Sequence, residues 1–361
     1  MIAGGGTAGH VLPGLAVAGA LVARGHDPAS IRFLGSARGL DGTLVPAAGF
    51  AVELLPGRGI QRKLTTDNVG AALGLFVAFW RSLFSLLRWR PSAMLVLGGY
   101  ASVMPAIVAA LLRIPVVVTE QNARASATNR LAARWARSCA VPFEGTDLPK
   151  AVVTGSPVRA EVLAAAALDP QARRLARADL GADDGVPFVL AFAGSLGSRR
   201  INEAVGGLIG RWAERDVLVY HVVGARDFDA GLVPQAPDGR LRYRAVRYAD
   251  DLPMLMACAD VAVCRAGGGV AELAVMGLPS VLVPLPGAPA DHQRANAAVF
   301  AEVGAAVVVD DGEMDGDRLA AELDALLGGD ALEPMAAAAR SLARPRAADD
   351  IATLLESAAS T

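Results

Sequence analysis

Short β-rich runs alternate with helical stretches along most of the chain, and this alternation constrains the fold more than any other feature. It predicts parallel sheets whose strands are joined by covering helices. In the first half, the β-rich runs are Ile31–Leu34, Ala93–Leu97 and Pro115–Val118, and the helical stretches include Leu15–Ala23 and Met104–Leu112. The first residues read as the end of a strand of about three residues that runs directly into a glycine loop.

The second half of the chain repeats the scheme, which indicates two similar domains. Its β-rich runs are Pro187–Phe192, Val217–Tyr220, Asp260–Val263, Ser280–Val283 and Ala305–Val309. The 361 residues also exceed the size at which a single core usually keeps growing. A turn-like stretch places the boundary near Pro157, and an Ala-rich tail from about Arg346 reads as a last helix. We therefore predict an α/β protein of two doubly wound Rossmann-like domains, residues 1–157 and 158–344, that face each other across a ligand-binding cleft.

Composition and charge argue against several classes of protein. Apolar residues make up 53% of the chain, which suits a well-buried α/β protein, and the net charge of −2 argues against a nucleic-acid-binding protein. Cys139, Cys258 and Cys264 form no CxxC pair, which argues against a disulfide framework or a zinc site. The first residues lack the features of a signal peptide, and no segment has the roughly 20 uninterrupted apolar residues of a membrane span. The sequence predicts a cytoplasmic protein whose contact with membranes is peripheral.

The first glycine loop, Gly4-x-Gly6-x-x-Gly9, matches the dinucleotide-binding fingerprint. A nicotinamide-binding unit also needs an acidic residue at the end of its second strand, about 20 residues further on. Here that strand runs into Gly35-Ser36 and Asp41 comes too late, so NAD binding is disfavoured. The loop instead leaves room for a substrate beside His10, whose imidazole can accept a proton at neutral pH. The alternative is that His10 only caps a helix beginning near Pro13.

Two further glycine loops follow β-rich runs of the second half. Gly194–Ser198 opens a helix that starts with Arg199 and Arg200, and the backbone N–H groups at such a helix start suit a phosphate. Arg265–Glu272 contains three consecutive glycines that let the backbone approach a ligand closely, and Glu272 can accept two hydrogen bonds from a ribose. The alternatives are an ordinary strand–helix turn and compensation of a helix dipole by Glu272. Together the two loops indicate a site for a nucleoside diphosphate.

Asp227-Phe228-Asp229 has the spacing of a metal-binding DxD motif. It lies in a polar stretch between Gly224 and Gly231, far from the glycine loops in the sequence. We therefore interpret it as a solvated loop, and the sequence implies neither a metal site nor a need for a divalent cation.

Taken together, these motifs resemble one known family. Besides the three glycine loops they include Gly98-Gly99-Tyr100, Glu120-Gln121-Asn122 and Gly155–Arg159. In order and spacing, up to about Gly304, the chain closely resembles the MurG family within glycosyltransferase family 28. These bacterial enzymes transfer N-acetylglucosamine from UDP-N-acetylglucosamine to lipid I, giving lipid II for peptidoglycan synthesis. The resemblance implies a GT-B fold with the lipid acceptor on the N-terminal domain, the donor on the C-terminal domain, and the last helix, residues 345–361, packed back on the first domain.

The resemblance also assigns site residues by matching motif. The implied donor-binding residues are Asn122, Arg159, Gly194, Ser195, Gly197, Asn202, Ala249, Gly268, Gly269, Glu272 and Gln293. The implied acceptor-binding residues are Thr7, Gly9, Tyr100, Gln121 and Asn129, and the implied catalytic residues are His10 and Glu120. The chain departs from the family pattern where Leu196 and His292 each replace a frequent glutamine, and where the stretch around Gly267–Gly269 is one residue shorter.

The implied reaction is an inverting single displacement. The 4-hydroxyl of the lipid-linked muramyl sugar attacks the anomeric carbon as UDP leaves, and the diphosphate cradle stabilises the charge of the leaving group. His10 as general base would contribute about 10²–10⁴-fold to the rate, and Glu120 is the alternative for a shared or replaced role. No cofactor is implied beyond the donor substrate.

The segment Leu73–Arg90 indicates contact with a membrane. It is rich in large apolar residues and carries arginines beside Trp80 and Trp89. A helix of this composition can lie in the interface of an anionic bilayer. This predicts a peripheral protein on the cytoplasmic face of the cell membrane, and the alternative is a buried core helix.

Three other functions share parts of this pattern. They are a GT-B transferase acting on diacylglycerol or a natural product, a UDP-N-acetylglucosamine 2-epimerase, and an inactive sugar-nucleotide-binding scaffold. The presence of His10, Arg159 and Glu272 together argues against the inactive scaffold.

Overall fold

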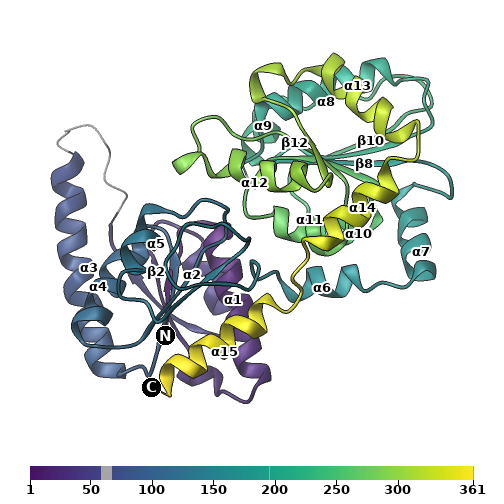
Figure 1. The fold of residues 1–361 in the computed structure, drawn as a ribbon. Coiled ribbons are helices and arrows are strands. Elements are labelled where there is room, and N and C mark those ends of the chain that lie inside the picture. Colours follow the sequence, from purple (N-terminus) through teal and green to yellow (C-terminus); the bar gives the residue numbers. More distant parts are fainter. Residues whose placement is uncertain (58–66, 195, 361) are drawn as a thin grey trace. The chain divides into compact units, whose positions relative to one another are not determined.

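A computed structural model describes residues 1–57, 67–194 and 196–360 (Figure 1). The chain divides into two compact units. The first contains Met1–Arg159 and the C-terminal segment from Arg344, and the second contains Ala160–Ala343. The division falls two residues after the predicted boundary at Pro157, so that Arg159 lies in the first unit and not in the predicted donor domain.

The described part of the first unit forms a parallel seven-stranded sheet in the order β3-β2-β1-β4-β5-β6-β7. Its strands are β1 (Ile2–Gly4), β2 (Arg32–Ser36), β3 (Ala51–Leu55), β4 (Met94–Gly98), β5 (Val116–Thr119), β6 (Ser138–Val141) and β7 (Ala151–Val153). Its α-helices are α1 (Ala8–Ala23), α2 (Asp41–Ala47), α3 (Asp67–Trp89), α4 (Val103–Leu111), α5 (Ala127–Ala132) and α15 (Ala347–Ala359).

Alternation along the strands divides the core of this unit into two layers. Leu95 and Leu97 of β4 pack on one face with Val17 of α1 and with Ile351 of α15. Val96, between the two leucines, packs on the opposite face with residues of α3, α4 and α5. Because both faces of a parallel sheet are covered, its central strands are apolar on both sides.

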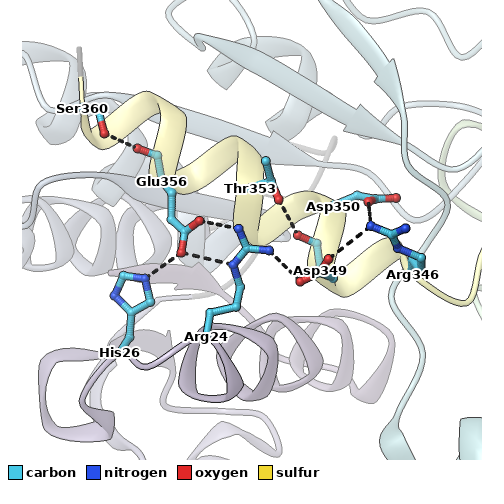
Figure 2. Close-up of polar contacts among 8 residues, drawn as sticks. All are labelled: Arg24, His26, Arg346, Asp349, Asp350, Thr353, Glu356 and Ser360. Atoms are coloured by element: carbon cyan, nitrogen blue, oxygen red, sulfur yellow. Dashed lines mark hydrogen bonds and ion pairs between the residues drawn. The ribbon is translucent and has the colours of Figure 1, made fainter.

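The last helix lies against the first helix of the chain. Arg24, just after α1, pairs with Glu356 at 2.6 Å and with Asp349 at 2.7 Å, and His26 Nε2 lies 2.9 Å from the Glu356 carboxylate (Figure 2). The apolar side of α15 buries Ile351 and Leu355 in the core of the first unit. The C-terminal segment therefore belongs structurally to the unit in which the chain begins.

The described part of the second unit forms a parallel six-stranded sheet in the order β10-β9-β8-β11-β12-β13. Its strands are β8 (Phe188–Phe192), β9 (Leu218–Val222), β10 (Arg242–Val246), β11 (Val261–Cys264), β12 (Ser280–Leu282) and β13 (Ala306–Val308). Its α-helices are α6 (Ala160–Ala166), α7 (Pro170–Leu180), α8 (Arg199–Arg211), α9 (Ala225–Asp229), α10 (Leu252–Cys258), α11 (Val270–Met276), α12 (His292–Glu302), α13 (Gly316–Leu327) and α14 (Leu332–Ser341).

Each sheet reverses its strand order once, next to its first strand in the sequence. β1 lies between β2 and β4, and β8 lies between β9 and β11. In doubly wound sheets, ligands bind at the carboxyl ends of the strands beside this reversal. The glycine loops after β1 and β4, and those after β8 and β11, therefore occupy the expected binding edge of each unit.

None of the helices in the described ranges is long and apolar enough to cross a membrane.

Candidate active site

The loop after β1 leads directly into α1. This helix begins at Ala8, so the prediction that it follows Pro13 is wrong. Pro13 lies inside the helix and lacks the N–H that would donate to the carbonyl of Gly9. His10 consequently occupies the first turn, next to the exposed Gly9, and its Nδ1 lies 3.0 Å from Oγ1 of the N-cap residue Thr7.

A buried carboxylate fixes this first glycine loop. The backbone N–H of Gly6 donates to Asp41 Oδ2 at 2.8 Å, and Asp41 is the first residue of α2. Gly5 has a positive φ of 152°, and a methyl group on it would lie 1.6 Å from Asp41 Oδ1. Any side chain at Gly5 would therefore displace the carboxylate, and the carboxylate disfavours a phosphate at the same amide.

The loop after β4 packs against the loop after β1. A methyl group on Gly99 would lie 3.7 Å from the His10 ring and 2.9 Å from the carbonyl oxygen of Gly5. The hydroxyl of Tyr100 is hydrogen-bonded to Ser36 Oγ at the end of β2. Three of the predicted acceptor-side residues, Thr7, His10 and Tyr100, are therefore brought together at the carboxyl ends of neighbouring strands.

Glu120 organises the loop that follows β5. Its side chain is 1% exposed. Oε1 accepts from the backbone N–H groups of Gln121 and Asn122 and from Asn122 Nδ2, at 3.0–3.1 Å. Oε2 accepts from Ser126 N at 2.9 Å and from Asn129 Nδ2 at 2.8 Å. A carboxylate that accepts five such bonds is a positioning group, and this geometry argues against the alternative of Glu120 as general base.

The same loop contains side-chain oxygens without a hydrogen-bond partner. Within the described ranges, Thr119 Oγ1, Gln121 Oε1 and Asn129 Oδ1 are buried and accept no hydrogen bond. A methyl group on Gly98 would lie 3.2 Å from Asn129 Oδ1, so α5 packs closely against the end of β4. Gln121 and Asn129, both predicted on the acceptor side, lie beneath the site surface.

In the second unit, the loop after β8 is closed by tight backbone packing. Gly197 has a φ of 76°, and a methyl group on it would lie 2.0 Å from the carbonyl oxygen of Val223. Ser198 then caps α8, accepting from Ile201 N at 3.4 Å, and the helix starts with Arg199 and Arg200 and has no acidic residue in its first turn. These features suit an anion. Gly194 lies in this loop, and Ser195 falls outside the described residues.

Asn202 supports this loop from below. Its Nδ2 donates to the carbonyl of Val223 at 3.1 Å and to Asp227 at 2.9 Å, and its Oδ1 lies 2.9 Å from His221 Nε2. The remaining ring nitrogen of His221 accepts from the hydroxyl of Tyr243 at 2.9 Å. Burial lowers the pKa of His221 to about 4. Asn202 is therefore a positioning residue whose polar atoms are engaged within the unit.

The DxD motif is part of the same network. Asp227 is buried in α9 and pairs with Arg226 at 2.9 Å, and the Arg226 guanidinium lowers the pKa of the Asp227 carboxyl. Asp229 pairs with Arg247 at 2.7 Å. The interpretation of the motif as a solvated loop is wrong for Asp227, because its carboxylate is taken up by Asn202 and Arg226. Across the described ranges, no group of three or more His, Cys, Asp or Glu side chains is arranged to hold a metal ion.

The loop after β11 gathers another set of predicted donor residues. Gly268 and Gly269 precede α11, and Glu272 stands in the first turn of that helix. Gln293 Oε1 accepts from the N–H of Leu285 at 2.9 Å, and its Nε2 lies 3.9 Å from where a methyl group on Gly267 would be. The structure thus places Glu272 and Gln293 around one backbone loop.

The remaining predicted donor residues belong to other segments of the chain. Ala249 is half-buried after β10, next to the exposed Tyr248. Asn122 and Arg159 belong to the first unit. Four residues of the site were not predicted: Asp41, which holds Gly6; Arg265 and Asp311, which form an ion pair; and Asn296, whose Nδ2 donates to the carbonyl of Ala266 at 2.9 Å.

Models of known families match most of the chain. The glycosyltransferase family 28 N-terminal domain matches residues 1–141, and the glycosyltransferase family 28 C-terminal domain matches residues 188–351. Similar proteins named UDP-N-acetylglucosamine–N-acetylmuramyl-(pentapeptide) pyrophosphoryl-undecaprenol N-acetylglucosamine transferase occur in several bacteria. That of Desulforudis audaxviator is 34% identical over 99% of this chain and 97% of its own length. That of Burkholderia ambifaria is 38% identical over 98% of this chain and 94% of its own length.

Solved structures agree. The crystal structure of Acinetobacter baumannii MurG has a TM-score of 0.76 and 26% identity, covering 99% of both chains. The calicheamicin glycosyltransferase CalG4, at 16% identity, has a TM-score of 0.70 over 99% of this chain and 97% of its own, which shows a shared fold alone. Fold and loops thus define a glycosyltransferase of the GT-B class, as predicted. More specifically, the chain belongs to glycosyltransferase family 28.

Proposed function

We propose that the protein transfers N-acetylglucosamine from UDP-N-acetylglucosamine to lipid I, the undecaprenyl-diphosphate-linked muramyl pentapeptide. The observation that carries the proposal is the pairing of two loops at the strand-order reversal of the second sheet. The loop after β8 opens into α8 with Arg199 and Arg200, and the adjacent loop after β11 places Glu272 in the first turn of α11. The names of the full-length relatives support the choice of donor and acceptor.

Charge and hydrogen bonding support the assignment of the donor to the second unit. The N-terminus of α8 carries partial positive charge, which two arginines reinforce, so a diphosphate is the ligand that this end of the helix favours. The Glu272 carboxylate is suited to accept hydrogen bonds from both hydroxyls of a ribose. As the bond between the anomeric carbon and the diphosphate breaks, the same groups stabilise the charge that UDP carries away.

His10 is the proposed general base for the acceptor. The tautomer that donates Nδ1–H to Thr7 Oγ1 carries its basic lone pair on Nε2. Nε2 takes the proton of the muramyl 4-hydroxyl while that oxygen forms its bond to the anomeric carbon. The glycosidic oxygen enters as UDP departs from the opposite side, so the configuration at the anomeric carbon is inverted.

We also propose that α3 docks on the cytoplasmic face of the membrane. One side of this helix is buried through Ala78, Ser82 and Leu86. The other side exposes large apolar residues: Leu73, Phe76, Val77, Trp80, Phe84 and Leu87. This stripe argues against the alternative of a wholly buried core helix. Near the end of the helix, the Arg32 guanidinium lies 3.3 Å from the centre of the Trp89 ring, which places positive charge beside the aromatic side chain.

The function is tested by following labelled sugar from UDP-N-acetylglucosamine. The wild-type protein is expected to transfer it to a soluble lipid I analogue. Transfer only to diacylglycerol would contradict the acceptor assignment. Release of UDP with an epimerised sugar, in the absence of any acceptor, would instead support an epimerase.

Docking is tested by sedimentation with anionic phosphatidylglycerol vesicles. Because α3 presents a continuous stripe, Phe84→Asp should reduce binding roughly tenfold, as expected for losing a buried aromatic anchor and adding a charge. Leu175 of α7 is equally exposed, and Leu175→Asp serves as the control. Equal losses in both variants would contradict docking through α3.

A further inference from the structure

Arg265 follows β11 and turns its guanidinium among neighbouring loops. The side chain is only 13% exposed. Nη1 donates to the carbonyl of Val283 at 3.0 Å and to that of Pro284 at 3.3 Å, and it lies 2.6 Å from Asp311 Oδ1. Nη2 donates to Ser198 Oγ at 2.6 Å. One side chain thus contacts three segments besides its own.

Each of these segments follows the carboxyl end of a strand of the second sheet. Ser198 follows β8, Val283 and Pro284 follow β12, and Asp311 follows β13. Together with β11, these are four consecutive strands of the second sheet. The Arg265 guanidinium therefore ties together the loops at the carboxyl ends of all four strands.

The tied loops are those that the proposed function uses. Ser198 caps α8, whose N-terminus is the proposed diphosphate site. The carbonyl of Ala266, next to Arg265, accepts from Asn296 Nδ2, which fixes the start of the loop that leads to Glu272. Pro284 precedes Leu285, whose N–H donates to Gln293. A shift of the guanidinium would move each of these groups relative to the others.

Resting on the proposed function, we propose that Arg265 is the positioning residue of the donor site, with Asp311 as its anchor. Arg265 holds the loops after β8, β11, β12 and β13 at the spacing that binds the nucleoside diphosphate. It acts through Ser198 and the loop carbonyls, since its guanidinium is engaged by the protein itself. A lysine cannot replace it, because an ammonium lacks the planar fork that reaches several acceptors at once.

The second unit also contains a matched control residue, which lies at the amino ends of the strands of the same sheet. Arg177 of α7 is also 13% exposed. It donates to both carboxylate oxygens of Asp260, at 2.9 and 3.1 Å, and to the carbonyl of Val186 at 2.8 Å. Asp260 also accepts from the N–H of Phe188, the first residue of β8, so this arginine ties the amino ends of β8 and β11. It has the same chemistry as Arg265 but no place near the donor loops.

The experiment measures the Kd of UDP by calorimetry, the KM of donor and acceptor, and the Tm for wild type, Arg265→Lys, Asp311→Asn and Arg177→Lys. Arg265→Lys should raise the Kd of UDP and the donor KM roughly tenfold, the affinity equivalent of one charge-assisted hydrogen bond. Its acceptor KM should stay unchanged. Asp311→Asn should act in the same direction but more weakly. Arg177→Lys should lower the Tm at least as much as Arg265→Lys and leave the Kd of UDP unchanged.

Each outcome decides a separate question. Unchanged UDP binding in Arg265→Lys, or equal weakening in Arg177→Lys, would overturn the positioning role. Should Arg265→Lys fail to fold, unchanged UDP binding in Asp311→Asn would overturn it instead. Failure of the wild type to bind UDP would overturn the proposed donor. Wild-type UDP binding without transfer to lipid I would overturn only the acceptor assignment.

Discussion

The two units place a glycine loop and a helix N-terminus at the same point of the same topology, yet side chains of opposite charge stand at the two loops. After β1, the N–H of Gly6 is bound by the buried carboxylate of Asp41. After β8, the loop opens into a helix that starts with Arg199 and Arg200 and has no acid in its first turn. The first loop thus disfavours an anion at its amides, and the second favours one.

This difference indicates how the same architecture can bind an acceptor in one unit and a nucleotide donor in the other. The carboxylate of Asp41 holds the first loop in place, and His10, the proposed general base, lies in the helix that follows. Basic side chains at the second loop suit the diphosphate of a leaving group. The glycine motif alone therefore does not identify a phosphate site, because the side chain that reaches its amides decides what can bind.

The largest effect is expected from His10. The proposed role of His10 as general base predicts that His10→Ala lowers kcat by about 10²–10⁴-fold and leaves the Kd of UDP unchanged. Steady-state transfer and calorimetry measure the two quantities. A large loss of UDP affinity would contradict the assignment of donor binding to the second unit, because it would place the donor at the loop after β1.

Glu272 should show the reverse pattern. Because the proposed role of Glu272 is to accept two hydrogen bonds from the ribose, Glu272→Ala should raise the Kd of UDP by about 10²-fold. Saturating donor should restore much of the rate. A variant that binds UDP normally but turns over slowly would contradict the ribose assignment, and Glu272→Gln provides a variant of equal size for comparison.

Asp41 tests the first loop directly. Asp41→Asn removes the charge that holds Gly6 N and should lower kcat roughly tenfold, as expected for weakening one hydrogen bond to a charged group. UDP affinity should not change. Asp229→Asn, which breaks an exposed ion pair with Arg247, is the matched control. If the two variants retain equal activity, the carboxylate has no role in positioning His10.

The stability of the protein should depend on pH through His221, whose ring is hydrogen-bonded to Asn202 beneath the loop after β8. Burial lowers the pKa of His221 from 6.5 to about 4, so the folded protein keeps this ring neutral while the unfolded chain binds a proton below pH 6.5. The resulting stability is fully present above pH 6.5 and is lost as the pH falls toward 4, by up to roughly 3 kcal/mol. Denaturant unfolding from pH 7 to 4 measures it. A His221→Gln variant should lose this part of the pH dependence, and an unchanged slope would contradict the assignment.

Sequence reasoning located most of the central strands but missed β6, which pairs with two strands, and the edge strands β3, β7 and β10. The runs that became β4, β5, β8 and β11 are continuous apolar segments, because both of their faces are covered. β3 and β10, which were not predicted, are edge strands and carry Glu53, Arg242 and Arg244. An edge strand has one partner and tolerates charge, so its pattern resembles that of a loop.

Site residues were predicted where one short stretch of sequence carries the motif. They were missed where residues distant in the sequence come together. The glycine motifs, His10 and Glu272 were predicted because each belongs to one short stretch of sequence that contains a glycine loop and the start of the following helix. Asp41 was noticed but rejected as too late for a ribose contact, and only the fold shows that it reaches back to Gly6. The partners of Arg265, which include Ser198 and Asp311, come from separate loops. Ser198 precedes Arg265 by 67 residues. Such contacts follow from strand order, which local sequence does not specify.

The most direct test of the division between the two loops is hydrogen exchange of the wild-type protein with and without UDP. With UDP bound, exchange should be slower at the amides of Gly197–Arg200 and Gly267–Glu272, and unchanged at the amides of Gly6–His10. Slower exchange at Gly6–His10, with no change at the loops after β8 and β11, would contradict this division.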